Sequence, residues 1–243
     1  MNNQTIEKLK LMRLGSMAQL HRQHITDKQF NNMTPDEYLA LLVDHEYEER
    51  QNNKINRLIN QARFKQQATL NNIDFTQSRN LDKNMFNRLS TLDFISKKEN
   101  LIITGASGVG KSYLAQALGH QACQIGKRVL YQNTARLFKK LKLAKVDGTY
   151  LKELQLLLKT ELLILDDFGL QSFDNHARET LMDVIDDRYN QSSTIIASQL
   201  PVSTWYDIIG EGTVADAILD RIVNSSHRID LKGESLRKEI IKS

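Results

Sequence analysis

Residues 101–112 read Leu-Ile-Ile-Thr-Gly-Ala-Ser-Gly-Val-Gly-Lys-Ser. From Gly105 onward this stretch fits the pattern G-x-x-x-x-G-K-[ST] at every fixed position, and an apolar run directly precedes it. The residues that follow place Leu114, Ala117 and Leu118 on one face of a predicted helix. A strand, a glycine-rich loop and a helix in this order predict a loop that binds nucleotide phosphates. The alternative, a plain glycine turn before a helix, fits this context poorly.

Each part of this loop has an expected task. Gly105, Gly108 and Gly110 let backbone N–H groups turn towards phosphate oxygens without a clash from a Cβ atom. The helix that follows adds the positive end of its dipole. Lys111 is expected to reach the β- and γ-phosphates, and the Ser112 hydroxyl is expected to bind Mg²⁺. The nucleotide-binding residues predicted here are Gly105, Ala106, Ser107, Gly108, Val109, Gly110, Lys111, Ser112 and Tyr113.

Residues 162–167, Leu-Leu-Ile-Leu-Asp-Asp, supply the second half of the predicted site. Four apolar residues ending in two carboxylates place Asp166 at the C-terminal tip of a buried strand, facing the crevice of an open α/β sheet. Asp166 is expected to hold Mg²⁺ through a water. Asp167 is expected to polarise the water that attacks the γ-phosphate. Two aspartates after an apolar run are a weak signal alone, and the phosphate loop strengthens it.

Short apolar runs alternate with helical patterns from residue 101 onward. Runs of four to six apolar residues separated by helices predict βαβ units and a parallel sheet with helices on both faces. The expected fold class is therefore α/β. The runs that carry this prediction are residues 101–105, 128–133, 162–167 and 194–198.

The part of the chain before residue 101 has a different pattern. Thr34-Pro35-Asp36-Glu37 predicts a helix start, with Thr34 as N-cap, proline at the first helical position and Glu37 completing a capping box. Nothing breaks that helix until about Lys65. The sequence therefore predicts an all-α N-terminal domain over 1–65, a linker and entry to the core over 66–100, and a nucleotide-binding core over 101–243.

Composition narrows the class of protein. The chain has 243 residues, 40% apolar and 26% charged, with a net charge of +4, which is typical of a soluble globular protein. Cys123 is the only cysteine, so an intramolecular disulfide is excluded and a zinc site is not expected. The first residues do not resemble a signal peptide, and no apolar run has the length of a membrane span. We expect a cytoplasmic protein.

The basic residues are concentrated in two stretches. Residues 50–65 carry a charge of +5 and residues 127–152 carry +7, whereas residues 153–190 carry −6. Basic stretches of this kind are typical of proteins that bind nucleic acid, although a solvated helix face gives the same pattern. The candidate contacts to duplex DNA are Arg136, Lys139, Lys140, Lys142 and Lys145, with Arg50, Lys54 and Arg57 as a second group.

Four ordered blocks of sequence together indicate a family. The chain resembles AAA+ ATPases, and more narrowly the IstB-type transposition helper proteins of bacterial insertion sequences, which are related to DnaC-like helicase loaders. The resemblance implies an AAA+ P-loop NTPase core that hydrolyses ATP with Mg²⁺. It also implies ATP-dependent assembly of copies of the chain on duplex DNA, with a transposase as partner. The blocks are GASGVGKSYLAQALG, LLILDDFG, VIDDRYNQSSTIIASQLPVSTWYDIIG and ADAILDRIVNSSHRIDLKGESLRK.

The resemblance also implies roles for single residues. Ser198 or Gln199 matches the sensor that contacts the γ-phosphate or the attacking water. Arg221 matches the arginine finger offered to a neighbouring subunit; if it is structural instead, Asp216 or Asp220 is its expected partner. Arg237 matches the second sensor arginine. The catalytic residues expected are Lys111, Asp167, Ser198 or Gln199, and Arg221.

The chain departs from the general AAA+ pattern at the two acidic residues that end the predicted strand. Most AAA+ members have Asp-Glu where this chain has Asp166-Asp167. Aspartate is one methylene shorter, which suggests slow intrinsic hydrolysis.

Three other functions remain open at this point. A helicase loader has the same fold, but would bind single-stranded DNA and a replicative helicase. A small-molecule kinase needs neither Arg221 as a finger nor basic helices. A P-loop protein without turnover has the same sequence pattern. Residues 184–238 closely resemble the transposition helper proteins, which favours a function in transposition over a helicase loader.

Overall fold

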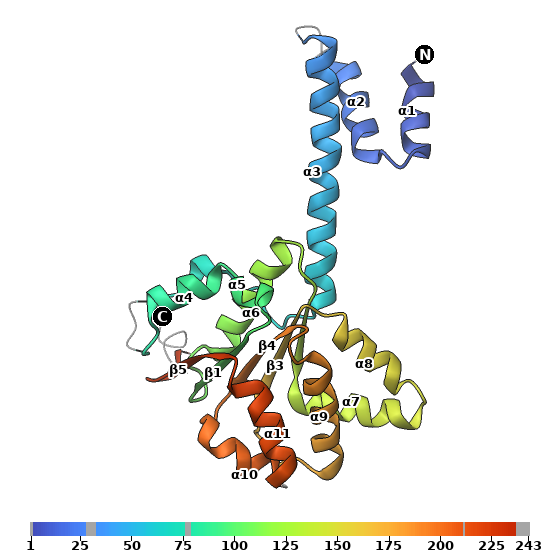
Figure 1. Cartoon of the computed structure of the whole chain (residues 1–243). Coiled ribbons are helices and arrows are strands. Elements are labelled where there is room, and N and C mark those ends of the chain that lie inside the picture. Colours follow the sequence, from blue (N-terminus) through green and yellow to red (C-terminus); the bar gives the residue numbers. More distant parts are fainter. Residues whose placement is uncertain (1, 28–32, 76–78, 211, 237–243) are drawn as a thin grey trace. The chain divides into compact units, whose positions relative to one another are not determined.

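The computed structural model describes residues 2–27, 33–75, 79–210 and 212–236 (Figure 1). Contacts between Cα atoms divide the chain into two units, residues 1–57 and 58–243. This division falls eight residues before the domain boundary expected from the sequence, and it lies within one helix. Among the described residues, no helix has the length and apolar character that crossing a membrane requires.

The first unit is helical. It contains α1 (Asn2–Leu11), α2 (Gly15–Asp27) and most of α3 (Pro35–Ala62). The predicted capping box at the start of α3 is confirmed, because the backbone N–H of Thr34 donates to Glu37 Oε2 at 2.7 Å and the N–H of Glu37 donates to Thr34 Oγ1 at 3.3 Å. The buried carboxylate of Glu46 accepts from the N–H of Met17 at 2.9 Å, which fastens α3 to α2.

The second unit is built on a sheet of five parallel strands in the order β2-β3-β4-β1-β5 (Figure 1). The prediction of a parallel α/β sheet is thereby confirmed. Because all five strands run in the same direction, their carboxyl ends meet at one edge. The register aligns Thr104 with Ser198 and Asn133 with Asp166. The strands are β1 (Asn100–Gly105), β2 (Val129–Asn133), β3 (Leu162–Phe168), β4 (Ser193–Ser198) and β5 (Ser226–Leu231).

Apolar side chains cover both faces of this sheet. In β1, Leu101 and Ile103 belong to one buried cluster, and Ile102 between them belongs to another. Alternate residues of a strand point to opposite faces, so β1 is buried on both. The first cluster includes α6 (Lys111–Gln124). The second includes α7 (Thr134–Val146), α8 (Tyr150–Leu158), α9 (Asn175–Arg188), α10 (Trp205–Ile209) and α11 (Gly212–Val223), with the short helix η3 (Val202–Thr204) beside α10.

Residues 66–100, which the sequence predicts to be a linker and entry to the core, contribute buried side chains to the core. They form η2 (Leu70–Asn72), α4 (Lys83–Ser90) and α5 (Asp93–Ser96). Phe86, Leu89 and Ile95 are buried in the first apolar cluster. Asp82 caps α4 by accepting from the N–H of Met85 at 2.8 Å. Helices of eight and four residues are too short to give a periodic apolar signal, and the polar start of this segment hides their packing.

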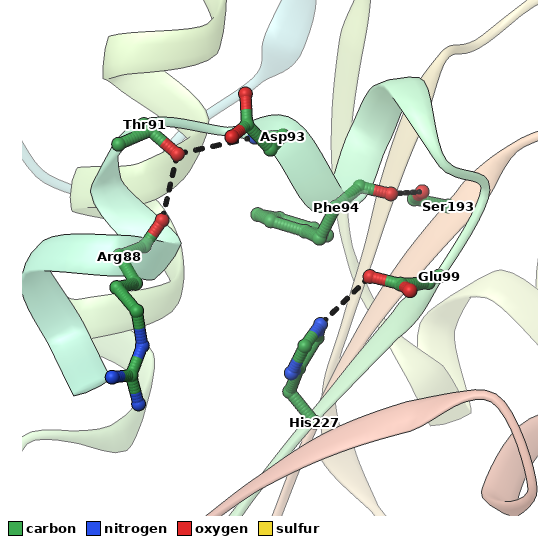
Figure 2. A network of polar contacts seen from close by, with 7 residues as sticks. All are labelled: Arg88, Thr91, Asp93, Phe94, Glu99, Ser193 and His227. Carbon is green, nitrogen blue, oxygen red and sulfur yellow. Dashed lines mark hydrogen bonds and ion pairs between the residues drawn. The ribbon is translucent and has the colours of Figure 1, made fainter.

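Polar contacts fasten the same segment to the sheet. Figure 2 shows the Ser193 hydroxyl of β4 bonded to the carbonyl of Phe94 in α5, at 3.2 Å. In the same view, His227 of β5 lies 2.8 Å from the carboxylate of Glu99. The turn between the two helices is closed by Thr91, whose hydroxyl donates to the carbonyl of Arg88 at 2.8 Å. The segment is therefore an integral part of the second unit.

Candidate nucleotide-binding site

The predicted phosphate loop connects β1 to α6. Its glycines Gly108 and Gly110 have φ values of 86° and 98°, a backbone conformation that residues with a Cβ atom rarely adopt. At Gly108 a Cβ atom would lie 2.0 Å from the hydroxyl of Ser235, and the carbonyl of Gly108 accepts from the N–H of Leu236 at 3.1 Å. Residues 235–236, which follow β5, therefore lie directly against the loop.

Lys111 and Tyr113 lie where the loop passes into α6. The Lys111 amine is buried and donates to the carbonyl of Ala106 at 2.7 Å, so the side chain folds back over its own loop. The hydroxyl of Tyr113 lies 3.3 Å from both the N and the O atoms of Thr69, which ties the first turn of α6 to the segment before η2. Ala106 and Ser107 are exposed, and Val109 is buried.

The serine of the loop and the first strand-tip aspartate meet as the sequence predicts. Ser112 Oγ donates to Asp166 Oδ1 at 2.9 Å, and Asp166 is only 2% exposed. Tyr131 donates to the other carboxylate oxygen of Asp166. Burial and this hydrogen bond raise the pKa of Tyr131, which keeps its hydroxyl protonated as a donor. Hydroxyl and carboxylate oxygens suit Mg²⁺, which typically takes one or two protein ligands and fills its shell with phosphates and water.

Asp167 is held in an uncommon conformation at the end of β3. Its φ is 56°, and the pairing of β3 with β4 shifts register between Leu165 and Phe168. Such an irregularity turns a side chain in a new direction. The amide of Asn133 donates to Asp167 Oδ2 at 2.8 Å, while its oxygen accepts from the N–H of Arg136 and caps α7. Asn133 thus connects Asp167 to the start of α7.

Ser198 and Gln199 differ in their surroundings. Ser198 is fully buried, and its hydroxyl donates to the carbonyl of Phe168 at 2.8 Å and accepts from the N–H of Leu200 at 3.1 Å. The hydroxyl of Ser198 therefore already donates one hydrogen bond and accepts another, and these bonds link the end of β3 to the residues after β4. The amide of Gln199 is half-buried and has no bonding partner in the described parts of the chain.

Arg221 makes a different contact from the one expected. Its guanidinium pairs with Asp186 of α9 at 2.8 Å and lies over the ring of Tyr189. The expectation of Asp216 or Asp220 as partner is wrong, because residues one and five positions before Arg221 do not face it on a helix. Asp220 instead accepts from Asn224. Arg237 lies outside the described residues.

Acidic residues neutralise part of the predicted DNA-binding stretch. Lys140 pairs with Glu153 of α8, Lys145 lies 3.4 Å from Glu179 of α9, and Lys142 lies 3.8 Å from Asp174. The side chains of Arg136 and Lys139 are exposed and have no ion-pair partner within the described ranges. In the first unit Arg50 pairs with Glu46 at 2.7 Å, and the exposed Lys54 and Arg57 have no such partner among the residues described.

A cavity of about 440 Å³ adjoins Asp167. The start of α7, the residues after β3 and the start of α9 form its walls. Lys139 and Lys142 line it together with Asn133 and His176. Two of the candidate DNA-binding residues, Lys139 and Lys142, therefore border the same cavity as the strand-tip carboxylate of Asp167.

Sequence reasoning missed two residues of this site, Tyr131 and Asn133. Tyr131 lies inside an apolar run, where an aromatic side chain is ordinary. Asn133 carried a usable signal, since an asparagine between a strand and a helix is a preferred N-cap. Its strand ends beside β3, so its side chain was in reach of the strand-tip acids.

Known proteins that are similar to this chain are described as ATP-binding proteins. The family model described as IstB-like ATP binding protein matches residues 7–242. A putative insertion sequence ATP-binding protein of Sinorhizobium fredii is 45% identical over 96% of this chain and 96% of its own length. An insertion sequence putative ATP-binding protein of Pseudomonas fluorescens is 42% identical over 84% of this chain and 89% of its own length.

Solved structures agree on the fold. The structure of DnaI has a TM-score of 0.59 at 21% identity and covers 73% of this chain and 94% of its own. The DnaC helicase loader has a TM-score of 0.54 at 23% identity and covers 65% of this chain and 95% of its own. The fold is therefore that of AAA+ P-loop proteins. With the family model matching almost the whole sequence, this chain belongs to the family of IstB-like ATP-binding proteins of insertion sequences.

Proposed function

We propose that this chain is an ATP-dependent, DNA-binding regulator of transposition that acts in the bacterial cytoplasm. In this proposal copies of the chain assemble on duplex DNA, hydrolyse ATP with Mg²⁺, and recruit or activate a transposase. The insertion sequence relatives support the context of transposition. The observation that carries the ATPase part is the contact of Ser112 with Asp166, 2.9 Å apart at the edge where the strands end.

Each polar group at this edge has its own task in the proposed hydrolysis. Lys111 would neutralise charge on the β- and γ-phosphate oxygens. Ser112 and Asp166 would hold Mg²⁺, Asp166 through a water, and the bound ion supplies positive charge that stabilises the phosphoryl group in transfer. Asp167 would accept a hydrogen bond from the attacking water and orient it. Between the two sensor candidates, the free amide favours Gln199 over Ser198.

Two arginines complete the proposed machinery. Arg221 would act on the nucleotide of a neighbouring subunit, for which it must exchange its pairing with Asp186. Arg237 would act on the nucleotide of its own subunit. Its position in the sequence supports that role, because the preceding residue, Leu236, is bonded to Gly108 in the phosphate loop.

Arg136 and Lys139 are the proposed main contacts to DNA on α7. Both are exposed, and no acidic side chain in the described structure neutralises them. Lys140, Lys142 and Lys145 are proposed as weaker contacts because Glu153 of α8, Asp174 at the N-cap of α9 and Glu179 of α9 already pair with them. A single subunit with only a few phosphate contacts would bind DNA weakly. An assembly of several subunits would combine these contacts and bind DNA more tightly.

The test is a comparison of duplex and single-stranded DNA binding with ATP, with ADP and without nucleotide. We expect the tightest binding to duplex DNA with ATP. Lys111→Ala should lose ATP binding and should then bind DNA in ATP no better than the parent chain without nucleotide. Equal ATP affinity of Lys111→Ala and the parent would contradict the assignment of the site.

A replicative helicase loader is the second candidate function. The fold similarity to the DnaC helicase loader favours it, at 23% identity. The same DNA-binding experiment separates the two, because a loader should prefer single-stranded DNA. The insertion sequence relatives, at up to 45% identity, make transposition our first proposal.

A further inference from the structure

Arg79 places a buried positive charge against the phosphate-binding loop. The side chain is only 6% exposed. Its Nη1 atom donates to the carbonyl of Val109, in the loop, at 3.4 Å, and Nη2 donates to the carbonyl of Asp74 at 2.6 Å. Backbone carbonyls of such a loop point away from the phosphates that its N–H groups face. Arg79 therefore contacts the outer side of the loop.

The backbone around Arg79 is fixed to the sheet. The carbonyl of Arg79 accepts from the N–H of Lys232, just after β5, at 3.0 Å. The side-chain amide of the next residue, Asn80, donates to the carbonyl of Asp230 at 3.0 Å. These two bonds hold the segment beside the loop, so the guanidinium has a defined position.

The loop comes close to the guanidinium at position 110. A Cβ atom on Gly110 would lie 2.8 Å from Arg79 Nη1. Gly110 also has a positive φ and directly precedes Lys111. The same glycine therefore serves the turn of the loop and the approach of the arginine.

A buried guanidinium in this position needs compensation by negative charge. Burial lowers the pKa of Arg79 and the charge of Asp74 offsets part of that cost, but an arginine stays protonated in a protein. Its Nε atom is buried without a hydrogen-bond partner in the described structure. A buried charge without full compensation is costly. The anion that this loop is built to receive is a nucleotide phosphate.

We propose that Arg79 is a positioning residue for the nucleotide. It braces the loop at Val109 and Gly110 and adds a fixed positive charge on the outer side of the loop, behind the N–H groups that face the α- and β-phosphates. The loop N–H groups cradle those phosphates, whereas Lys111 reaches the β- and γ-phosphates. Arg79 therefore favours ATP and ADP alike. The inference rests on ATP binding alone and is independent of DNA binding, assembly and the transposase.

The test compares nucleotide affinity in Arg79→Met, which keeps much of the apolar volume and removes the charge. Affinities for ATP and ADP, each with Mg²⁺, should both fall by about tenfold, the size of one charge-assisted contact, and their ratio should stay unchanged. In steady-state hydrolysis KM for ATP should rise while kcat changes little, because uniform binding is lost. Arg79→Lys should recover part of the affinity.

Asn80→Ala is the matched control. It removes one of the two bonds that hold this segment beside the loop, but leaves the charge of Arg79 and the backbone bond from Lys232 to Arg79 in place, so nucleotide affinity should stay close to that of the parent. Parent affinity in a folded Arg79→Met variant, or an equal loss in Asn80→Ala, overturns the proposal. If Arg79→Met does not fold, Arg79→Lys decides. A lysine lacks the planar pair of donors, so both affinities should fall by about threefold, and unchanged affinities overturn the proposal.

Discussion

Asp167 combines an unfavourable backbone conformation with a tightly held side chain. Its φ of 56° costs free energy that the surrounding sheet must supply, and the bond from Asn133 at 2.8 Å fixes the carboxylate. Strain retained at the tip of a buried strand is typical of a functional position. In the proposed mechanism Asp167 would hold the attacking water more accurately than a more flexible side chain would.

The first prediction concerns that carboxylate. Asp167→Asn keeps the size of the side chain and can still accept from Asn133, but removes the charge that polarises water. ATP should bind with parent affinity, because Lys111, Ser112 and Asp166 are untouched. Hydrolysis should fall by about 100-fold or more. Titration with ATP and measurement of phosphate release check the two parts, and parent-rate hydrolysis would place the water-orienting group elsewhere.

The second prediction uses Cys123, which is buried in α6. Burial raises the pKa of its thiol from 9.0 to about 12. The thiolate is the reactive form, so a thiol reagent at pH 8 should label the folded chain very slowly and the unfolded chain quickly. Because the folded pKa is the higher one, this group's contribution to stability is complete below pH 9 and is lost as pH rises towards 12. Measurement of the labelling rate with and without denaturant checks the difference in reactivity. Fast labelling of the folded protein would contradict the burial of Cys123.

At the scale of elements, α7 carries the clearest distinction between exposed and neutralised basic residues. Arg136 and Lys139 have no acidic partner in the described structure, whereas Lys140 on the same helix pairs with Glu153. A basic side chain that is already paired with an acid of the protein neutralises a DNA phosphate less completely, so fewer counterions leave the DNA. The two kinds of residue therefore provide a test and its control on one helix.

The third prediction follows from this difference. Arg136→Ala with Lys139→Ala should weaken duplex binding at every sequence in the ATP state and reduce the salt slope by about 2 for each subunit. Lys140→Ala should change the slope less, and ATP affinity should not change in either variant. Lys54→Ala with Arg57→Ala, in the first unit, should also have a smaller effect. An unaltered slope in the first variant would remove α7 from the DNA path.

The elements differ in how well their sequences predict them. The strands and α6 are readable because apolar runs, glycines and the Lys111-Ser112 pair are local signals. The packing of α4 and α5 is not, since short helices lack a period. The contact of Arg79 with the loop joins residues thirty positions apart, and a single arginine in a polar stretch gives no sign of burial. Likewise the pairing of Arg221 with Asp186 depends on how α11 packs on α9.

At the scale of the whole molecule, the fourth prediction concerns assembly. Arg221→Ala should bind ATP and hydrolyse it poorly if the arginine acts on a neighbour's nucleotide. Mixing it with Lys111→Ala should restore part of the activity, because an interface can combine an intact nucleotide site with an intact arginine. Asp186→Ala is the control for a structural role, since it removes the same pairing and leaves Arg221 in place. Normal hydrolysis by Arg221→Ala, or no recovery in the mixture, would contradict a role between subunits.

The strand order also determines when a newly made chain can complete the surroundings of its phosphate loop. β1 carries the phosphate loop, yet its two neighbours in the sheet are β4 and β5, which the ribosome makes much later. At about 5 to 20 residues per second, roughly 120 residues and about 6 to 24 s of translation separate Gly105 from the start of β5. Throughout that interval the apolar β1 has an unpaired edge, and the loop lacks its contact with Leu236. In a nascent chain, β1 therefore cannot pair on both sides, and the phosphate loop cannot gain its contact with Leu236, until residues 226–236 have been made.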